Sequence, residues 1–142
     1  MRLIITILLL LSSPYAIAGE PSPRSLLDGY IKSQESRGDV FSQSREFDHF
    51  DYRAALKLAS AEDRPGLVAL LQYSGRSSLM GEGAEDHAAI LVALLSTWGD
   101  ARFSAALQSC SPKAASSVQD FLDYGGATKE QFPLTFAVVG TR

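Results

Sequence analysis

The chain has two histidines, and the first lies in the stretch FDHFDY, residues 47–52, between two aspartates. Imidazole and carboxylate groups bind zinc and similar metals. A metal site is therefore one interpretation of this stretch, with the second histidine and its acidic neighbours completing the ligand set. The candidate ligands are Asp48, His49, Asp51, Glu85 or Asp86, and His87. The spacing matches no local metal signature, because the sequence contains neither H-E-x-x-H nor a pair of Cys-x-x-Cys motifs.

The same stretch also fits the beginning of a helix, and this interpretation is favoured. Asp48 would cap the helix, and Asp51 would reach back from the third helical position as in a capping box. Phe47 and Tyr52 would form the hydrophobic pair that often brackets such a start. Both acids would lie in the first turn, where the helix dipole favours negative charge. His49 has no role in this arrangement, and we expect it to be neutral and partly exposed.

The second histidine, His87, lies in line with apolar residues at helical spacing in the segment AEDHAAILVALLSTWGD. A buried imidazole needs hydrogen-bond partners, and burial lowers its pKa. The pattern favours a histidine that is satisfied within the core. The alternative is a functional histidine that senses pH or contacts a ligand.

Motifs of other enzyme chemistries are absent from the sequence. There is no G-x-S-x-G nucleophile elbow, phosphate-binding loop or dinucleotide fingerprint. The chain also lacks asparagine, so no N-glycosylation acceptor exists and no asparagine can orient a Cys–His pair. Adjacent acids such as Glu85 and Asp86 are an ordinary choice for a first helical turn. The sequence therefore favours a protein that is not an enzyme, with no catalytic residue and no cofactor.

The first eighteen residues have the pattern of a signal peptide. Arg2 is followed by the apolar run Leu3 to Leu11, and Ala16-Ile17-Ala18 fits the small-x-small cleavage pattern. The apolar run is too short to cross a bilayer, which takes about 20 residues. We expect cleavage after Ala18 and a periplasmic or secreted mature protein without a stable membrane anchor.

The charge of the chain argues against one class of partner. The formal net charge of −3 becomes −4 when Arg2 is removed with the signal peptide, and acidic and basic residues are mixed along the chain. Such a surface offers no patch to neutralise phosphates, so we expect no nucleic-acid partner.

Cys110 is the single cysteine, which excludes an intramolecular disulfide. Its helical spacing favours a small buried side chain; a reactive thiol or an intermolecular bridge is the alternative.

Hydrophobic spacing predicts an all-α domain. Residues 19–46 read as a flexible leader, a short helix and a polar connection over residues 33–44, and residues 47–142 as the helical domain. Apolar faces repeat at helical spacing within residues 52–59, 67–74, 87–98, 103–110 and 115–122. Asp100 and Ser111 are the expected N-caps of the last two of these helices. The apolar tail FPLTFAVVG is compatible with a strand or with a segment docked on the helices.

A possible internal repeat suggests how the helices are arranged. Residues 54–74 align without gaps on residues 90–110 after a shift of thirty-six positions, which matches the period of two-helix repeats. We therefore expect a small bundle or a short stack of antiparallel helical hairpins, with the apolar C-terminal tail packed against it. The resemblance to stacked helix-pair repeats covers only these segments and carries no diagnostic motif.

One connection between helices stands out, the loop SGRSSLMGEGA at residues 74–84. Its apolar pair Leu79 and Met80 either closes the end of the core or contacts a partner, since loops on rigid scaffolds often carry function. The leading hypothesis is an exported, non-catalytic protein that binds another exported protein, as an inhibitor or immunity-type protein would. The alternative is a metal- or small-ligand-binding protein that uses His49, His87 and nearby acids.

Overall fold

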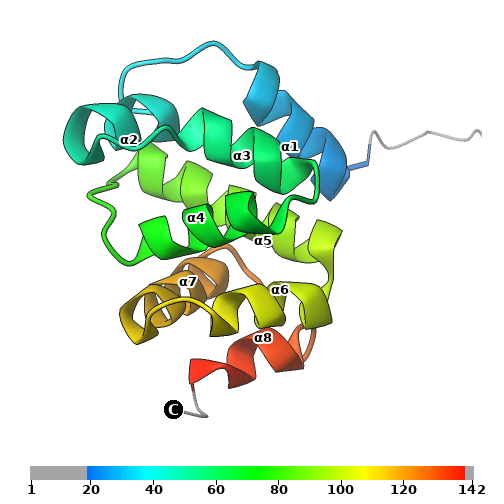
Figure 1. The fold of residues 1–142 in the computed structure, drawn as a ribbon. Coiled ribbons are helices and arrows are strands. Elements are labelled where there is room, and N and C mark those ends of the chain that lie inside the picture. Colours follow the sequence, from blue (N-terminus) through cyan, green and yellow to red (C-terminus); the bar gives the residue numbers. More distant parts are fainter. Residues whose placement is uncertain (1–18, 140–142) are drawn as a thin grey trace, which may run out of the picture.

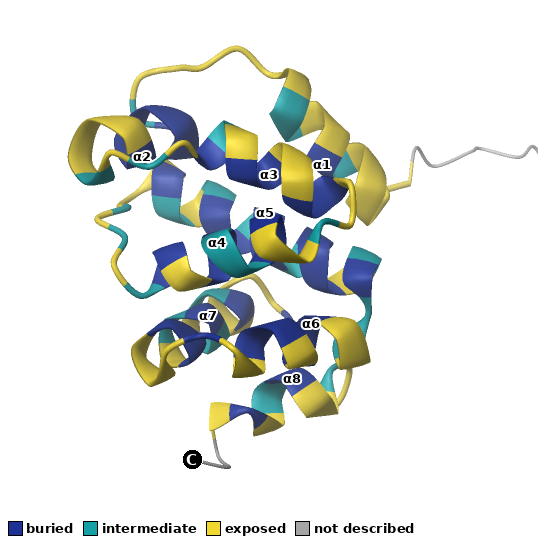
Figure 2. Cartoon of the chain, in the orientation of Figure 1, coloured by how far each residue is buried: buried dark blue, intermediate teal, exposed yellow. Residues whose placement is uncertain are grey.

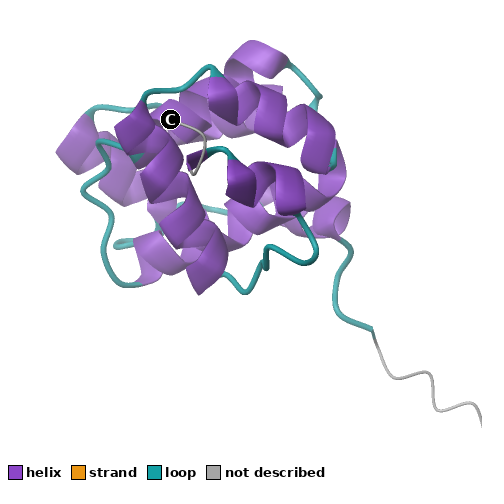
Figure 3. Ribbon diagram, turned by 90° about the horizontal axis from the view of Figure 1, so that it is seen from below, coloured by secondary structure: helices purple, strands orange, loops and turns teal. Residues whose placement is uncertain are grey.

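The computed structural model describes residues 19–139, and within them the chain forms eight helices and no strand (Figures 1 and 3). The all-α class predicted from the sequence is confirmed. The helices are α1 (Pro23–Lys32), α2 (Val40–Asp48), α3 (Tyr52–Ser60), α4 (Arg64–Ser74), α5 (Glu82–Trp98), α6 (Asp100–Gln108), α7 (Pro112–Tyr124) and α8 (Pro133–Ala137).

The helices form three levels in the view of Figure 1. α1, α2 and α3 lie uppermost, α4 and α5 lie in the middle, and α6, α7 and α8 lie below. α5 is the central element, because it packs against α1 and α2 on one side and against α6 and α7 on the other. Buried residues from α1 through α7, together with Ala127 and Val138, belong to one core.

Short polar side chains begin most of the helices by accepting hydrogen bonds from backbone N–H groups of the first turn. The carboxylates of Asp39, Asp51 and Asp63 accept from the third residue beyond each of them, at 2.8, 3.0 and 2.9 Å. Ser111 caps α7 in the same way at 3.1 Å, as the sequence predicts, and Pro112 follows it. These local signals explain where the chain turns between helices.

The predicted apolar faces of α3, α4 and α5 are buried as expected. α3 and α4 approach closely at Gly66, where an added Cβ would lie 2.4 Å from the Cβ of Leu58. Trp98, at the end of α5, donates its indole N–H to the carbonyl of Ala59 in α3 at 3.0 Å. Cys110 is also buried, in agreement with the expectation of a small core side chain.

Two predictions around the opening stretch are wrong. Residues 33–44 are not a surface connection throughout, because residues 40–44 are buried in α2. The stretch FDHFDY does not begin a helix at Asp48, which is the last residue of α2. His49 follows in the left-handed conformation with φ 51°, and its N–H bonds the carbonyl of Ser44. α3 begins only after Asp51, so the stretch is a junction between two helices.

The C-terminal part of the chain also differs in detail from the sequence-based expectation. Gly99, and not Asp100, precedes the first residue of α6. Asp100 instead accepts from the N–H groups of Leu134 and Thr135, at 2.9 and 2.8 Å, and so fixes the start of α8. Residues 133–137 of the apolar tail are therefore helical, and α8 packs against α6.

Several further predictions are not decided by the fold. The expected signal peptide at residues 1–18 lies outside the described residues and stays a prediction. The repeat of residues 54–74 and 90–110 also stays a prediction; the second segment spans α5 and α6, which are bent by 117° relative to one another. Within residues 19–139, no single helix is long and apolar enough to cross a membrane, although the bent pair of α5 and α6 qualifies by length and composition.

Candidate functional site

His87 is fully buried at the centre of the molecule, and both of its ring nitrogens have partners. Nδ1 lies 2.6 Å from the Tyr52 hydroxyl, and Nε2 lies 2.8 Å from the Ser74 hydroxyl. The Ser74 hydroxyl also lies 3.3 Å from the carbonyl of Leu70, and it can donate to that carbonyl when Ser74 Oγ accepts from Nε2–H. Tyr52 then donates to Nδ1, and every polar atom of the group is satisfied by a neutral imidazole.

Aromatic rings complete the surroundings of His87. Tyr52, Tyr73 and Phe121 meet the imidazole edge to face, with ring centroids 5.5, 5.9 and 4.6 Å away. Burial lowers the pKa of His87 to about 3 and raises the pKa of Tyr52 well above its ordinary value. His87 is thus the satisfied core histidine that the sequence favours, without access for a ligand.

The structure does not bring the candidate metal ligands together. His49 is exposed at the end of α2, whereas His87 is enclosed. Asp48 is engaged by Tyr73 and Ser78, and Asp51 caps α3. Within the described part of the chain, no group of three or more His, Cys, Asp or Glu side chains is placed to hold a metal ion.

The loop between α4 and α5 has a different character, because side chains of α2 hold its backbone in place. The buried amide of Gln43 accepts from Met80 N–H and donates to the Met80 carbonyl, both at 2.9 Å. Gln43 also donates to the carbonyl of Gly38. Gly83 makes room for this amide, since an added Cβ would lie 2.7 Å from it. Both backbone groups of Met80 are therefore fixed by one side chain.

A second anchor lies at the last residue of α2. The Asp48 carboxylate accepts from Ser78 N–H at 2.9 Å and from the Tyr73 hydroxyl at 2.7 Å. Desolvation tends to raise the pKa of Asp48, but the hydrogen bonds from Ser78 and Tyr73 outweigh it and hold the pKa below its ordinary value. Arg76 donates to the Asp48 carbonyl at 3.3 Å and lies over the rings of Phe50 and Tyr73.

The anchored loop directs its two apolar side chains differently. Leu79 is half-buried and packs against the core, whereas Met80 is 65% exposed. Phe47, one turn beyond Gln43 on the same side of α2, is 55% exposed. Figure 2 shows the exposed end of α2 beside the exposed part of this loop. We call the surface formed by Phe47, Leu79 and Met80 the apolar edge.

Comparison with known proteins identifies no relative. No protein-family model matches the chain, and neither a curated protein nor a solved structure is significantly similar to it. The assignment of function therefore rests on the geometry of the molecule.

The sequence singled out Leu79 and Met80 but gave no sign of the residues that hold them. Gln43 lies thirty-seven positions before Met80, inside a stretch whose polar composition indicated a loop. The sequence pattern predicts that Phe47 lies at a helix start and packs against Tyr52. Gln43 and Phe47 are four residues apart, a spacing that puts them on one side of a helix. This spacing is informative only if residues 40–48 are first recognised as a helix.

Proposed function

We propose that this chain is an exported, non-catalytic protein that acts by binding another protein through its apolar edge. The observation that carries the proposal is the geometry of Met80, whose backbone is fixed at both N–H and C=O while its side chain remains 65% exposed. A loop that is already ordered before binding loses little conformational entropy when a partner covers it.

The side chains of the apolar edge suit a protein partner. Methionine is flexible and polarisable, so it adapts to irregular surfaces. Aromatic residues and methionine are enriched at the centres of protein interfaces. Phe47 and Met80 are both more than half exposed, and they belong to two elements joined through Gln43.

Export is the second part of the proposal, and its support is the sequence of residues 1–18. A positive start, a short apolar run and the Ala-x-Ala pattern are typical of a cleaved signal. An exported partner follows from the compartment, and an inhibitor or immunity-type role fits the small helical scaffold. The alternative of ligand binding through His49 and His87 has no geometric support, since the two imidazoles lie in separate environments.

Photo-crosslinking of the mature protein tests this proposal in the exported fraction of its native host. A benzophenone amino acid replaces Met80 in one variant and Leu58 in a matched control. Leu58 is 51% exposed and lies on α3, outside the apolar edge. We expect a protein adduct from position 80 that is absent from position 58. No adduct at position 80, or the same adducts at both positions, would contradict the proposal.

A further inference from the structure

A groove of about 370 Å³ lies beside the apolar edge, between α1, the connection before α2, and the first turn of α5. Its apolar part is formed by Leu26, Gly29 and Phe41, and Tyr30 adds an aromatic wall. Glu82, which lines the groove, is only two positions beyond Met80. The groove and the apolar edge are further joined by Gln43, whose amide bonds both Gly38 and Met80.

The charged groups that line this groove are all acidic, namely Asp39, Glu82 and Asp86. Asp86 accepts from the Tyr30 hydroxyl at 2.8 Å and from Val40 N–H at 3.2 Å, so its position is fixed by two neighbouring helices. Asp39 is fixed as the N-cap of α2. Glu82 is exposed, and its carboxylate makes no hydrogen bond or ion pair with any described residue.

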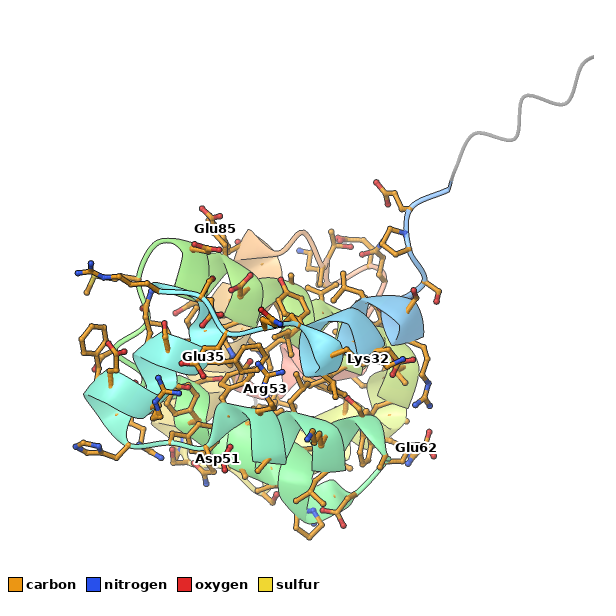
Figure 4. The ribbon with its side chains drawn as sticks, turned by 90° about the horizontal axis from the view of Figure 1, so that it is seen from above. Lys32, Glu35, Asp51, Arg53, Glu62 and Glu85 are labelled. Atoms are coloured by element: carbon orange, nitrogen blue, oxygen red, sulfur yellow. The ribbon has the colours of Figure 1, made fainter. Side chains whose placement is uncertain are left out.

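The electrostatic environment of Tyr30 agrees with this description. Desolvation raises the pKa of Tyr30, and the hydrogen bond to Asp86 and the charges of Asp86 and Glu82 raise it further. Two arginines of the neighbouring helices already have partners. Arg53 donates to the carbonyls of Tyr30 and Ile31 at 3.1 and 2.7 Å, and its guanidinium lies 3.9 Å from the centre of the Phe41 ring. Arg45 pairs with Glu35, a residue of the connection before α2. Figure 4 shows Glu35 near Arg53 on the upper face.

We propose that this groove receives a lysine or arginine side chain of the same protein partner that covers the apolar edge. The alkyl stem of such a residue would pack on Leu26 and Tyr30, while its charge would lie near Glu82 and Asp86. Charge complementarity selects this occupant, because the groove combines an apolar floor with acidic walls and has no lining cation. This inference rests on the proposed function and adds the chemistry of the partner.

The test uses small probes that reproduce only the side chain. Nα-acetyl-lysine methylamide and Nα-acetyl-arginine methylamide are titrated into the mature protein, and backbone amide shifts are followed by NMR. Nα-acetyl-norleucine methylamide is the uncharged control. We expect saturable shifts at Gly29, Tyr30 and Glu82 with the two cationic probes, weakening as salt is added. The norleucine probe should give none.

Two substitutions in the first turn of α5 form a matched pair. Glu82 and Glu85 are both exposed there, but only Glu82 lines the groove, and Glu85 projects outward at the margin of the molecule in Figure 4. Glu82→Gln should weaken binding of the lysine probe about threefold, as expected for a partly exposed ion pair, and Glu85→Gln should leave it unchanged. Equal effects of the two variants would overturn the assignment.

Two further results would also overturn it. One is the absence of saturable shifts with both cationic probes up to about 100 mM, well beyond the range of a weak site. The other is binding of 1,5-diaminopentane about 100-fold tighter than the lysine probe, which would identify a site for a free cation. These probes do not need Met80, and Met80→Ser should leave their binding intact. Failure here is thus distinct from failure of the crosslink at position 80.

Discussion

The segment between Ser74 and His87 contains two regions that reverse the usual distribution of polar and apolar groups. At its ends, Ser74 and His87 are buried polar residues. Between them, Met80 is an apolar residue with 65% of its surface exposed. In both regions the polar atoms are fully hydrogen-bonded, those of the His87 ring by Tyr52 and Ser74 and those of the Met80 backbone by Gln43.

The difference between these regions lies in what remains available to another molecule. The His87 cluster has no free polar atom and no exposed surface, so its contribution is to the stability of the core. In the apolar edge the backbone of Met80 is also fully hydrogen-bonded, but the side chains of Phe47 and Met80 are exposed. The structure thus places the histidine in the core and the methionine on the surface, and the following predictions test this difference.

Acidification should produce the largest loss of stability on the His87 side of the comparison. The pKa of His87 is about 3 in the folded protein, against about 6.5 in an unfolded chain. Between these values the unfolded chain binds a proton that the native protein does not, so stability falls as the pH is lowered. Lowering the pH from about 6.5 to about 4.5 should cost about 2–3 kcal/mol, at about 1.4 kcal/mol per pH unit.

Urea denaturation across this pH range measures the effect. Aspartates with lowered pKa values, such as Asp48 and Asp100, contribute only at more acidic pH, mainly below about 4. The control is His49→Gln, which should retain the same slope because His49 is exposed. A stability that is flat from pH 6.5 to 4.5 would be incompatible with a buried, neutral His87.

Removing the imidazole should destabilise the protein even when an apolar residue replaces it. His87→Leu deprives the Tyr52 hydroxyl of its acceptor inside the core, whereas Ser74 keeps the Leu70 carbonyl. The expected loss is about 1–3 kcal/mol, measured by chemical denaturation. Tyr52→Phe in the same background should cost much less than it costs alone, because the two groups form one interaction. Additive losses would show that the pair is not coupled.

On the other side of the comparison, Gln43→Ala should release the loop. The change removes the hydrogen bonds to Gly38 and to both backbone groups of Met80, and we expect a loss of about 1–2 kcal/mol. Hydrogen exchange at the Met80 amide should accelerate more than exchange within α5. Gln34→Ala, at an exposed position, should change stability by less than about 0.5 kcal/mol. An unchanged Met80 amide would mean that the loop is ordered by other contacts.

The smallest effect on stability is expected at Met80 itself. Met80→Ser should alter the free energy of unfolding by less than about 0.5 kcal/mol, because the side chain makes little contact in the free protein. Leu79→Ser, at the neighbouring position, should cost more than about 1 kcal/mol, since Leu79 packs against the core. Equal losses in thermal denaturation would remove the distinction between the two side chains.

The predictable part of the fold is the part with regular apolar spacing. α3, α4, α5 and α7 carry such faces together with Asp, Ser, Pro or Gly signals at their ends. α2 was missed because Ser42, Gln43 and Ser44 occupy buried positions that are satisfied by hydrogen bonds and not by apolar contact. α8 has five residues, too few for a helical period to be evident.

The candidate site was predictable only in part for a related reason. Met80 is conspicuous in the sequence, but its exposure depends on hydrogen bonds from α2 to a loop far along the chain. The conformation of His49 was also not predictable from its residue type. His49 ends α2 in a left-handed conformation that is more typical of glycine. The N-cap of the following helix is therefore Asp51, three residues after the expected Asp48.

The most direct test of the binding role is the affinity for the partner captured at position 80, measured for matched serine variants. Met80 and Leu58 have similar exposure, but only Met80 belongs to the apolar edge. Met80→Ser should weaken binding by at least about tenfold, as expected for an interface anchor, and Leu58→Ser should leave it within about twofold. Unchanged affinity of Met80→Ser, with the wild-type fold retained, would contradict a binding role for this surface.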